Sequence, residues 1–117
     1  MQVTTGLSEA LGRYLDLSAN QMKVTASNMA NIDTPGYITQ GFDFEHEFSS
    51  AIHAKTSTPE PQVADVDGLV ARPDGNTVSL DRESLQLAKS QLQFRTGVEL
   101  LKHEFSRVMS AIHAESK

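Results

Sequence analysis

Two stretches of the chain place apolar residues every three or four positions, the spacing that keeps side chains on one face of an α-helix. The clearer stretch is C-terminal, where six apolar residues alternate steps of four and three, as in the a and d positions of a coiled coil. We expect a helix over residues 80–117, with Ser79 or Asp81 as its N-cap. The apolar residues of this stripe are Phe94, Val98, Leu101, Phe105, Val108 and Ile112.

The N-terminal stretch carries a second stripe, and polar residues occupy the opposite side. We expect a helix over residues 6–32, with Thr5 as its N-cap. Because Lys and Arg are not enriched on the polar side, the pattern favours packing against a partner over lying on a membrane surface. The members of this stripe are Leu7, Leu11, Leu15, Ser18, Met22, Ala26 and Met29.

The stretch between the helices, residues 33–79, lacks a long periodicity and begins with signals that end a helix. Thr34 precedes Pro35, which disfavours the helical conformation of Thr34, and Pro35 itself lacks the backbone N–H that a helix needs. Pro35 and Gly36 suit the central positions of a type II turn, which would place Tyr37 just beyond it.

A second turn signal lies at residues 73–76, where Pro, Asp, Gly and Asn follow one another. The flanking stretches, residues 70–72 and 77–79, are compatible with a short β-hairpin across this turn. Between the two turns, Phe42, Phe44 and Phe48 form either a local packing anchor or an exposed recognition element, with a short helix possible through Ile52.

Composition indicates an acidic middle in a chain of 117 residues, which is one domain at most. Residues 33–74 hold eight acidic residues against two basic ones, and the aromatic content of the whole chain is only 6%. Neither the middle nor the C-terminal segment has the basic face of a nucleic-acid-binding protein. The chain contains no Cys, and its first residues lack the basic region of a cleaved secretory signal.

Chemistry-bearing residues do not form a recognisable catalytic or metal-binding pattern. The four histidines, His46, His53, His103 and His113, include no pair at the spacing of three or four that a helical zinc site uses. The paired carboxylates Glu45/Glu47 and Asp65/Asp67 lie in a segment without an apolar pocket to tune them. We therefore expect no enzyme activity, no cofactor and no small-molecule substrate.

The fold expected is mainly α: two long amphipathic helices forming an elongated coiled-coil hairpin, joined by a loosely structured acidic middle, in a single domain over residues 1–117. The stripes are too wide for two helices to cover each other, so we expect other chains to cover the rest. Gly97 interrupts the C-terminal helix at a cost of about 1 kcal/mol relative to Ala, and marks either a close helix–helix approach or a weak point.

Residues 28–37 resemble the signature of flagellar axial proteins, the rod, hook and hook-associated subunits. A second match, residues 72–83 followed by the helix that ends in Ser110-Ala111-Ile112, is similar to the B-type rod proteins of the flagellar basal body, which are proximal-rod subunits. The uncharged residues 38–40 depart from the basic residue that the family often has there. The signature positions are Asn28, Ala30, Asn31, Thr34, Pro35, Gly36 and Tyr37.

The resemblance implies a structural subunit of the proximal rod in the periplasm, exported by the flagellar type III apparatus without a cleaved signal peptide. Its partners would be other rod subunits and the membrane-ring and rod-adaptor proteins, and it would be an oligomer in the rod. Its long helices would form the inner coiled-coil layer, with the stripe residues as the assembly seam, and its middle would contact other subunits. Phe44 and Phe48 resemble the short element that early axial subunits present to the export gate.

Two other functions remain open from the sequence. One is a stand-alone coiled-coil adaptor that dimerises through residues 94–112, and the other is the C-type short rod subunit, which resembles the N-terminal half. A stable closed dimer would favour the adaptor, because a rod subunit needs contacts that continue into a helical array.

Overall fold

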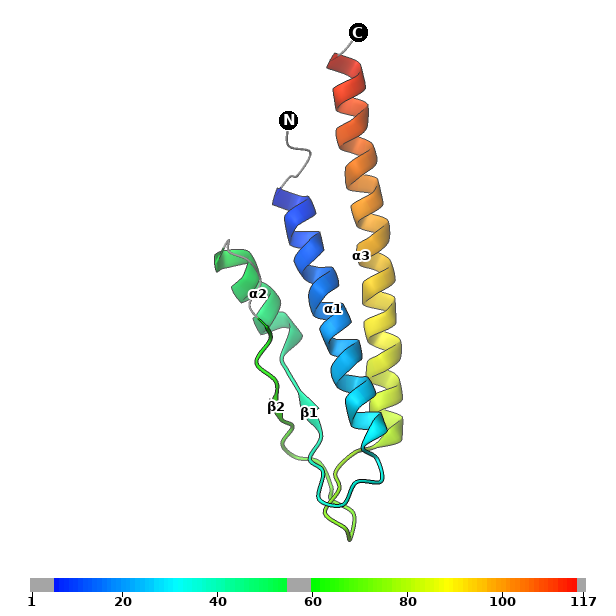
Figure 1. The fold of residues 1–117 in the computed structure, drawn as a ribbon. Helices are drawn as coiled ribbons and strands as arrows, with labels where there is room; N and C mark the ends of the chain where they lie inside the picture. The colour runs from blue at the N-terminus through cyan, green and yellow to red at the C-terminus, as the bar shows by residue number, and fades with distance from the viewer. Residues whose placement is uncertain (1–5, 55–59, 116–117) are drawn as a thin grey trace.

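The structure, a computed structural model, describes residues 6–54 and 60–115. Two long helices, α1 (Gly6–Ala30) and α3 (Leu80–Glu115), run antiparallel and side by side (Figure 1). The molecule is elongated, with extents of 70 × 25 × 17 Å. The predicted long N- and C-terminal helices and the elongated, mainly helical fold are thus confirmed. Among the described residues, no helix has the apolar length needed to cross a lipid bilayer.

The helix ends follow local signals. The helix α1 ends at Ala30, two residues before the predicted end, because residues 31–34 already form turns. Of the two predicted caps of α3, Ser79 is the one used: its Oγ accepts a hydrogen bond from Arg82 N at 3.3 Å. The predicted cap at Thr5 lies outside the described residues.

The buried residues of α3 are small or polar, whereas α1 also buries two leucines, Leu11 and Leu17. On α3 the buried positions recur every seven residues, which defines a buried row of Glu83, Ser90, Gly97 and Glu104. On α1 the buried residues include Ser8, Leu11, Ser18, Thr25 and Asn28. The Glu104 carboxylate is bonded by Arg107 at 2.8 Å, and this hydrogen bond raises the pKa of Arg107.

Gly97 marks the close approach that the sequence left as one of two options. A Cβ at this position would lie 2.8 Å from Leu15 Cδ2 and 3.1 Å from Tyr14 Cδ1. A larger side chain would therefore push the helices apart. Leu15 and Tyr14 fill the space that Gly97 leaves, and the large apolar side chains of α3 lie beside the buried row.

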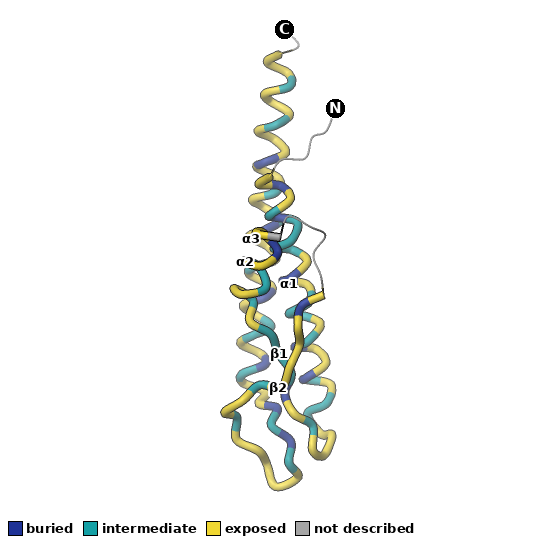
Figure 2. Tube along the Cα trace, turned by 90° about the vertical axis from the view of Figure 1, so that its left-hand side faces the viewer, coloured by how far each residue is buried: buried dark blue, intermediate teal, exposed yellow. Residues whose placement is uncertain are grey.

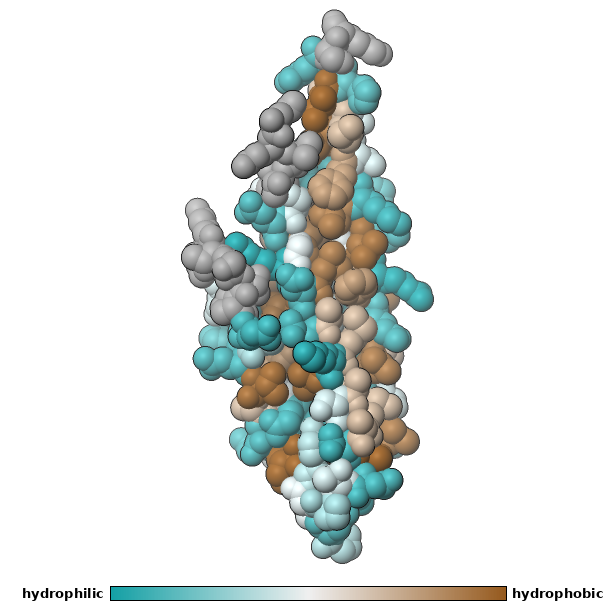
Figure 3. All heavy atoms as spheres, viewed as in Figure 1, coloured by the Kyte–Doolittle hydropathy of each residue, from teal (hydrophilic) through white to brown (hydrophobic). Residues whose placement is uncertain are grey.

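The displaced side chains form an apolar band along one face of the helical hairpin. Helical geometry places them on the same side of the α1–α3 contact, and all are half-exposed or exposed. Figure 3 shows apolar side chains gathered in a strip along the hairpin toward the C-terminal end of α3. The apolar band consists of Leu15, Met22 and Met29 of α1 with Phe94, Val98, Leu101, Phe105, Val108 and Ile112 of α3.

The short helix α2 (Phe44–Ala54) packs against α1 through an aromatic cluster. The Tyr14 ring makes edge-on contacts with Phe44 and Phe48, at centroid distances of 5.3 and 5.5 Å. Arg13 donates a hydrogen bond to Ala51 O at 2.8 Å, and burial raises the pKa of the Tyr14 hydroxyl. Of the two interpretations of the phenylalanines, the structure shows the packing anchor.

The strands β1 (Gln40–Gly41) and β2 (Ala64–Asp65) pair in antiparallel fashion and lie on the side of the hairpin seen in Figure 2. The predicted hairpin between residues 70–72 and 77–79 is wrong. The turn itself forms, since Gly75 N donates to Arg72 O at 2.8 Å, but Thr77 N then donates to Tyr37 O at 3.1 Å. The described part of the middle segment is thus more ordered than its composition predicts.

Replacing Gly97 by Val should destabilise the fold by about 1–3 kcal/mol, because the added methyl groups overlap Leu15 and Tyr14. The matched control is Gly12→Val, since a Cβ at Gly12 meets nothing within 4 Å. Chemical denaturation followed by circular dichroism measures both. Equal effects at the two positions would contradict a close approach at Gly97.

Candidate functional site

The two motifs that carry the family resemblance meet in the fold. Residues 28–40, which end α1, and residues 72–83, which begin α3, lie together at the closed end of the hairpin (Figure 1). We call these two segments the junction. Long-range hydrogen bonds join turn and amide residues of the two motifs here, so the junction is the candidate site.

The predicted turn at Pro35 and Gly36 is present. Tyr37 N donates to Thr34 O at 3.2 Å, and Gly36 has a φ of 75°, as the third residue of a type II turn requires. Thr34 Oγ1 donates to Asn31 Oδ1 at 3.0 Å, which connects the turn to the first residue after α1. Gly36 N also donates to Asp74 O at 2.9 Å, so the turn is held by the second motif.

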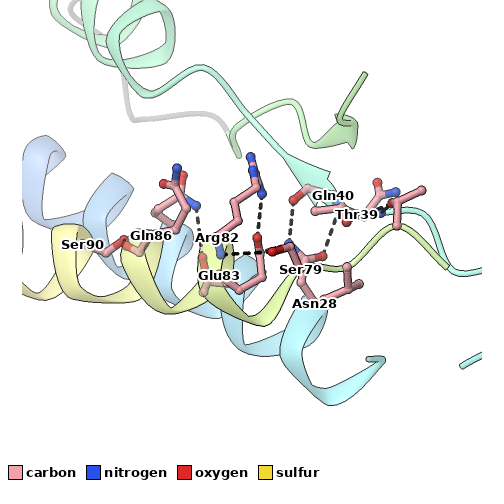
Figure 4. A network of polar contacts seen from close by, with 12 residues as sticks. Asn28, Thr39, Gln40, Ser79, Arg82, Glu83, Gln86 and Ser90 are labelled. Carbon is pink, nitrogen blue, oxygen red and sulfur yellow. Dashed lines mark hydrogen bonds and ion pairs between the residues drawn. The ribbon is translucent and has the colours of Figure 1, made fainter. Parts of the chain in front are cut away.

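Asn28 is the centre of the polar network that Figure 4 shows. Its Nδ2 donates to Gln40 O at 2.8 Å and to Glu83 Oε1. Its Oδ1 accepts from the Tyr37 hydroxyl and from Gln40 N, each at 3.0 Å. The side chain is 1% exposed and uses all four of its hydrogen-bonding positions. It therefore connects α1, the turn, β1 and α3.

Glu83 is a buried carboxylate, 1% exposed, at the start of α3. Besides the bond from Asn28, its Oε2 accepts from Arg82 at 2.6 Å. A buried charge is tolerated only when it is paired and hydrogen-bonded, and Glu83 meets both conditions. Glu83 lies in the first turn of α3, where an acidic residue interacts favourably with the helix dipole, and nothing local to residue 83 indicates its partner 55 positions away.

Asn76 makes the second amide link and was predicted only as a turn residue. Its Nδ2 donates to Asn31 O at 2.9 Å and to Thr34 O at 2.8 Å, and its Oδ1 accepts from Val78 N at 2.7 Å. The side chain is fully buried. Arg72 adds bonds to Val78 O at 2.7 Å and to Ile32 O. These contacts satisfy carbonyls that the end of α1 leaves without helical partners.

The structure brings most of the signature residues together. Asn28, Asn31, Thr34, Gly36 and Tyr37 all take part in the hydrogen bonds described above, and Pro35 lies in the turn. Ala30, the last residue of α1, is exposed. No buried side-chain nitrogen or oxygen in the described part of the chain lacks a hydrogen-bond partner.

The predicted assembly seam is spread over different environments. Leu11 is buried, Leu7 is 54% exposed, and the other seam residues form the apolar band. Phe94 and Phe105 of that band are 36% and 46% exposed. The candidate export-gate residues, Phe44 and Phe48, are half-buried against Tyr14.

The junction has the chemistry of a structural clamp. Its buried carboxylate, Glu83, is paired with Arg82, and its amides bind backbone carbonyls. Among residues 6–54 and 60–115, no three His, Asp or Glu side chains gather closely enough to hold a metal ion.

Comparisons with known proteins agree with the two motifs. A family model for flagella basal body rod proteins matches residues 15–37, from the Gly97 contact to the end of the turn. The flagellar basal body rod protein FlgB of Yersinia enterocolitica is 31% identical, over 84% of this chain and 87% of the relative. FlgB of Salmonella typhimurium is 30% identical, over 84% and 86%. FlgB of Bacillus subtilis is 29% identical, over 96% and 97%.

Replacing Asn28 by Ala should destabilise the fold by about 1–3 kcal/mol, because Glu83 and the groups on residues 37 and 40 lose their buried partner. Asn20→Ala is the matched control, since Asn20 donates only to Asp16 O within its own helix, and its effect should stay within about 0.5 kcal/mol. Urea denaturation measures both variants. Equal stability of the two variants would show that the hydrogen bonds of Asn28 do not hold the hairpin together.

Proposed function

Since this chain belongs to the FlgB family of flagellar basal body rod proteins and is a structural subunit of that rod, we propose that its apolar band is the surface through which it assembles. In this proposal the band packs against the helices of neighbouring rod subunits, which form the inner layer of the rod. The membrane-ring and rod-adaptor proteins are the further partners at the base of the rod.

The observation that supports this proposal is that large apolar side chains, which two packed helices usually bury between them, lie beside the contact in this hairpin. Small and polar residues lie between α1 and α3, while nine large apolar side chains lie beside the contact, half-exposed or exposed. Apolar surface removed from water contributes about 25 cal/mol per Å². In a single copy much of the apolar band stays in contact with water. A neighbouring subunit that covers the band would remove this surface from water and gain the corresponding free energy.

The C-terminal turns of α3 strengthen the argument. They continue past Gly6, the first described residue of α1 (Figure 1), and carry Val108, Met109 and Ile112. Met109 is 49% exposed. Because α1 does not cover these turns among the described residues, a neighbouring subunit is the partner that can bury them.

Replacing Phe105 by Asp should abolish assembly with other rod subunits, because a charge is placed in the centre of the band. The isolated fold should change by less than about 1 kcal/mol, since Phe105 is already 46% exposed. The matched control is Val70→Asp, the same chemical change at a residue that is 90% exposed and outside the band. Co-purification with the neighbouring rod subunits, and swimming of cells whose own copy carries the variant, provide the measurement. Normal assembly of Phe105→Asp, or a stable closed dimer of the unmodified chain, would reject the proposal.

The route of the chain to the rod is a second part of the proposal. We propose export by the flagellar type III apparatus without a cleaved signal, with Phe44 and Phe48 read by the export gate. These are two of the three rings in the cluster with Tyr14, and α2 contributes no contact to α3 among the described residues. Unfolding of α2 would therefore expose both rings without opening the helical hairpin.

Replacing Phe44 by Ala should lower secretion of the chain several-fold while its level inside the cell stays unchanged. Tyr14→Leu is the control, because it removes the same ring contact and leaves Phe44 in place. Immunoblots of the secreted and cellular fractions compare the variants. If both variants reduce secretion equally, loss of the Tyr14–Phe44 ring contact explains the reduction, and recognition of Phe44 by the export gate is excluded.

A further inference from the structure

The face of α3 that points away from α1 differs in charge from the rest of the molecule. Between residues 84 and 98 it carries Lys89 and Arg95 and no acidic residue. Both cations are exposed, and neither forms an ion pair with a described residue. The cations further along α3 differ, since Lys102 pairs with Glu99 and Arg107 pairs with Glu104. A free positive face is thus confined to the middle of α3.

The same face exposes large apolar side chains. Leu85 is 70% exposed and Leu92 is 66% exposed, and the two lie one heptad apart on the same side of α3. Leu92, Arg95 and Leu100 border a shallow hollow of about 450 Å³, which Glu99, the partner of Lys102, also lines. These residues are not part of the apolar band, because helical geometry places them on the far side of α3 from α1. We call residues 85, 89, 92 and 95 the outer face of α3.

The opposite edge of the molecule has the complementary charge. The described residues from 38 to 54 and from 60 to 71 hold six acidic residues and no Lys or Arg. This acidic layer also exposes Ile52 and Val63, which are 37% and 44% exposed. Figure 1 shows α2 and α3 on opposite sides of α1, and among the described residues α2 does not contact α3. The acidic residues are Asp43, Glu45, Glu47, Glu60, Asp65 and Asp67.

We propose that the outer face of α3 binds the acidic layer of a second copy of this chain. Lys89 and Arg95 pair with carboxylates of the layer, and Leu85 and Leu92 pack against its exposed aliphatic side chains. The two surfaces differ and lie on opposite edges, so the contact is heterologous and repeats from copy to copy, as an open helical array requires. The inference rests on the proposed function. It states that side-by-side copies of this chain in the rod contact each other through the outer face of α3 and the acidic layer.

Charge reversal tests this contact. Replacing both Lys89 and Arg95 by Glu should weaken self-association of the full chain about five- to tenfold at low ionic strength, because attraction becomes repulsion. Replacing both Glu60 and Asp67 by Lys should do the same from the other side. Mixing the two variants should restore association, since each reversed surface then meets its complement. Sedimentation equilibrium measures the dissociation constants, and added salt should weaken the association of the unmodified chain.

The control is reversal of Asp16 and Asp33 to Lys, which changes the net charge equally at exposed positions outside the acidic layer. An equal effect of this control, a mixture that fails to associate, or an unmodified chain that stays monomeric at millimolar concentration would overturn the contact. Phe105→Asp tests the apolar band separately. If that variant loses its rod partners while charge reversal on α3 has no effect, rod assembly stands and the lateral contact is rejected.

Discussion

The close approach of α1 and α3 determines most of what the rest of the molecule does. Gly97 leaves space only for the side chains of Leu15 and Tyr14, and the buried row of α3 is otherwise small or polar. The buried hydroxyls fit because they bond within their own helices: Ser18 Oγ donates to Tyr14 O at 2.8 Å, and Ser90 Oγ to Gln86 O at 2.7 Å. Neither serine needs a partner across the contact. The large apolar residues, which a two-helix coiled coil would bury, are left for other chains.

The junction supplies the specificity that this contact lacks. Apart from the contact of Leu15 and Tyr14 with Gly97, the small and polar residues of the row do little to oppose sliding of one helix along the other. The bonds from Asn28 to Glu83 and to β1 exist in one register only, and the bonds from Asn76 to the end of α1 hold the same register from the second motif. Polar groups that are buried and fully bonded penalise every alternative in which they lose their partners. The register therefore depends on two amide side chains.

The features that were predictable from the sequence are those set by local physics. The spacing of apolar residues predicts both long helices, and Pro35 with Gly36 predicts the turn, because each effect acts within a few residues. The facing row of α3 was not predictable in this way. The apolar spacing predicts that the largest apolar residues of α3 face α1. Gly97 and the other small or polar residues of the buried row face α1 instead. A seven-residue recurrence of small and polar residues, at 83, 90, 97 and 104, was the available signal. The partners of Asn76 and Glu83 in residues 28–34 lie 42 or more positions away, and neither turn propensity nor helix capping carries information over that distance.

Under the proposed export and assembly, a subunit that travels singly and then holds a long structure together needs stability of two kinds. The junction is polar and complete within one copy, so the closed end of the hairpin is held whether or not a neighbour is present. The apolar band extends from this end to the uncovered C-terminal turns of α3, and its free energy is available only on contact with other chains. Placing the polar network at one end and the apolar surface along the length separates folding from assembly. The monomer keeps a defined shape through the junction, while the apolar band is the surface that the proposed assembly would bury.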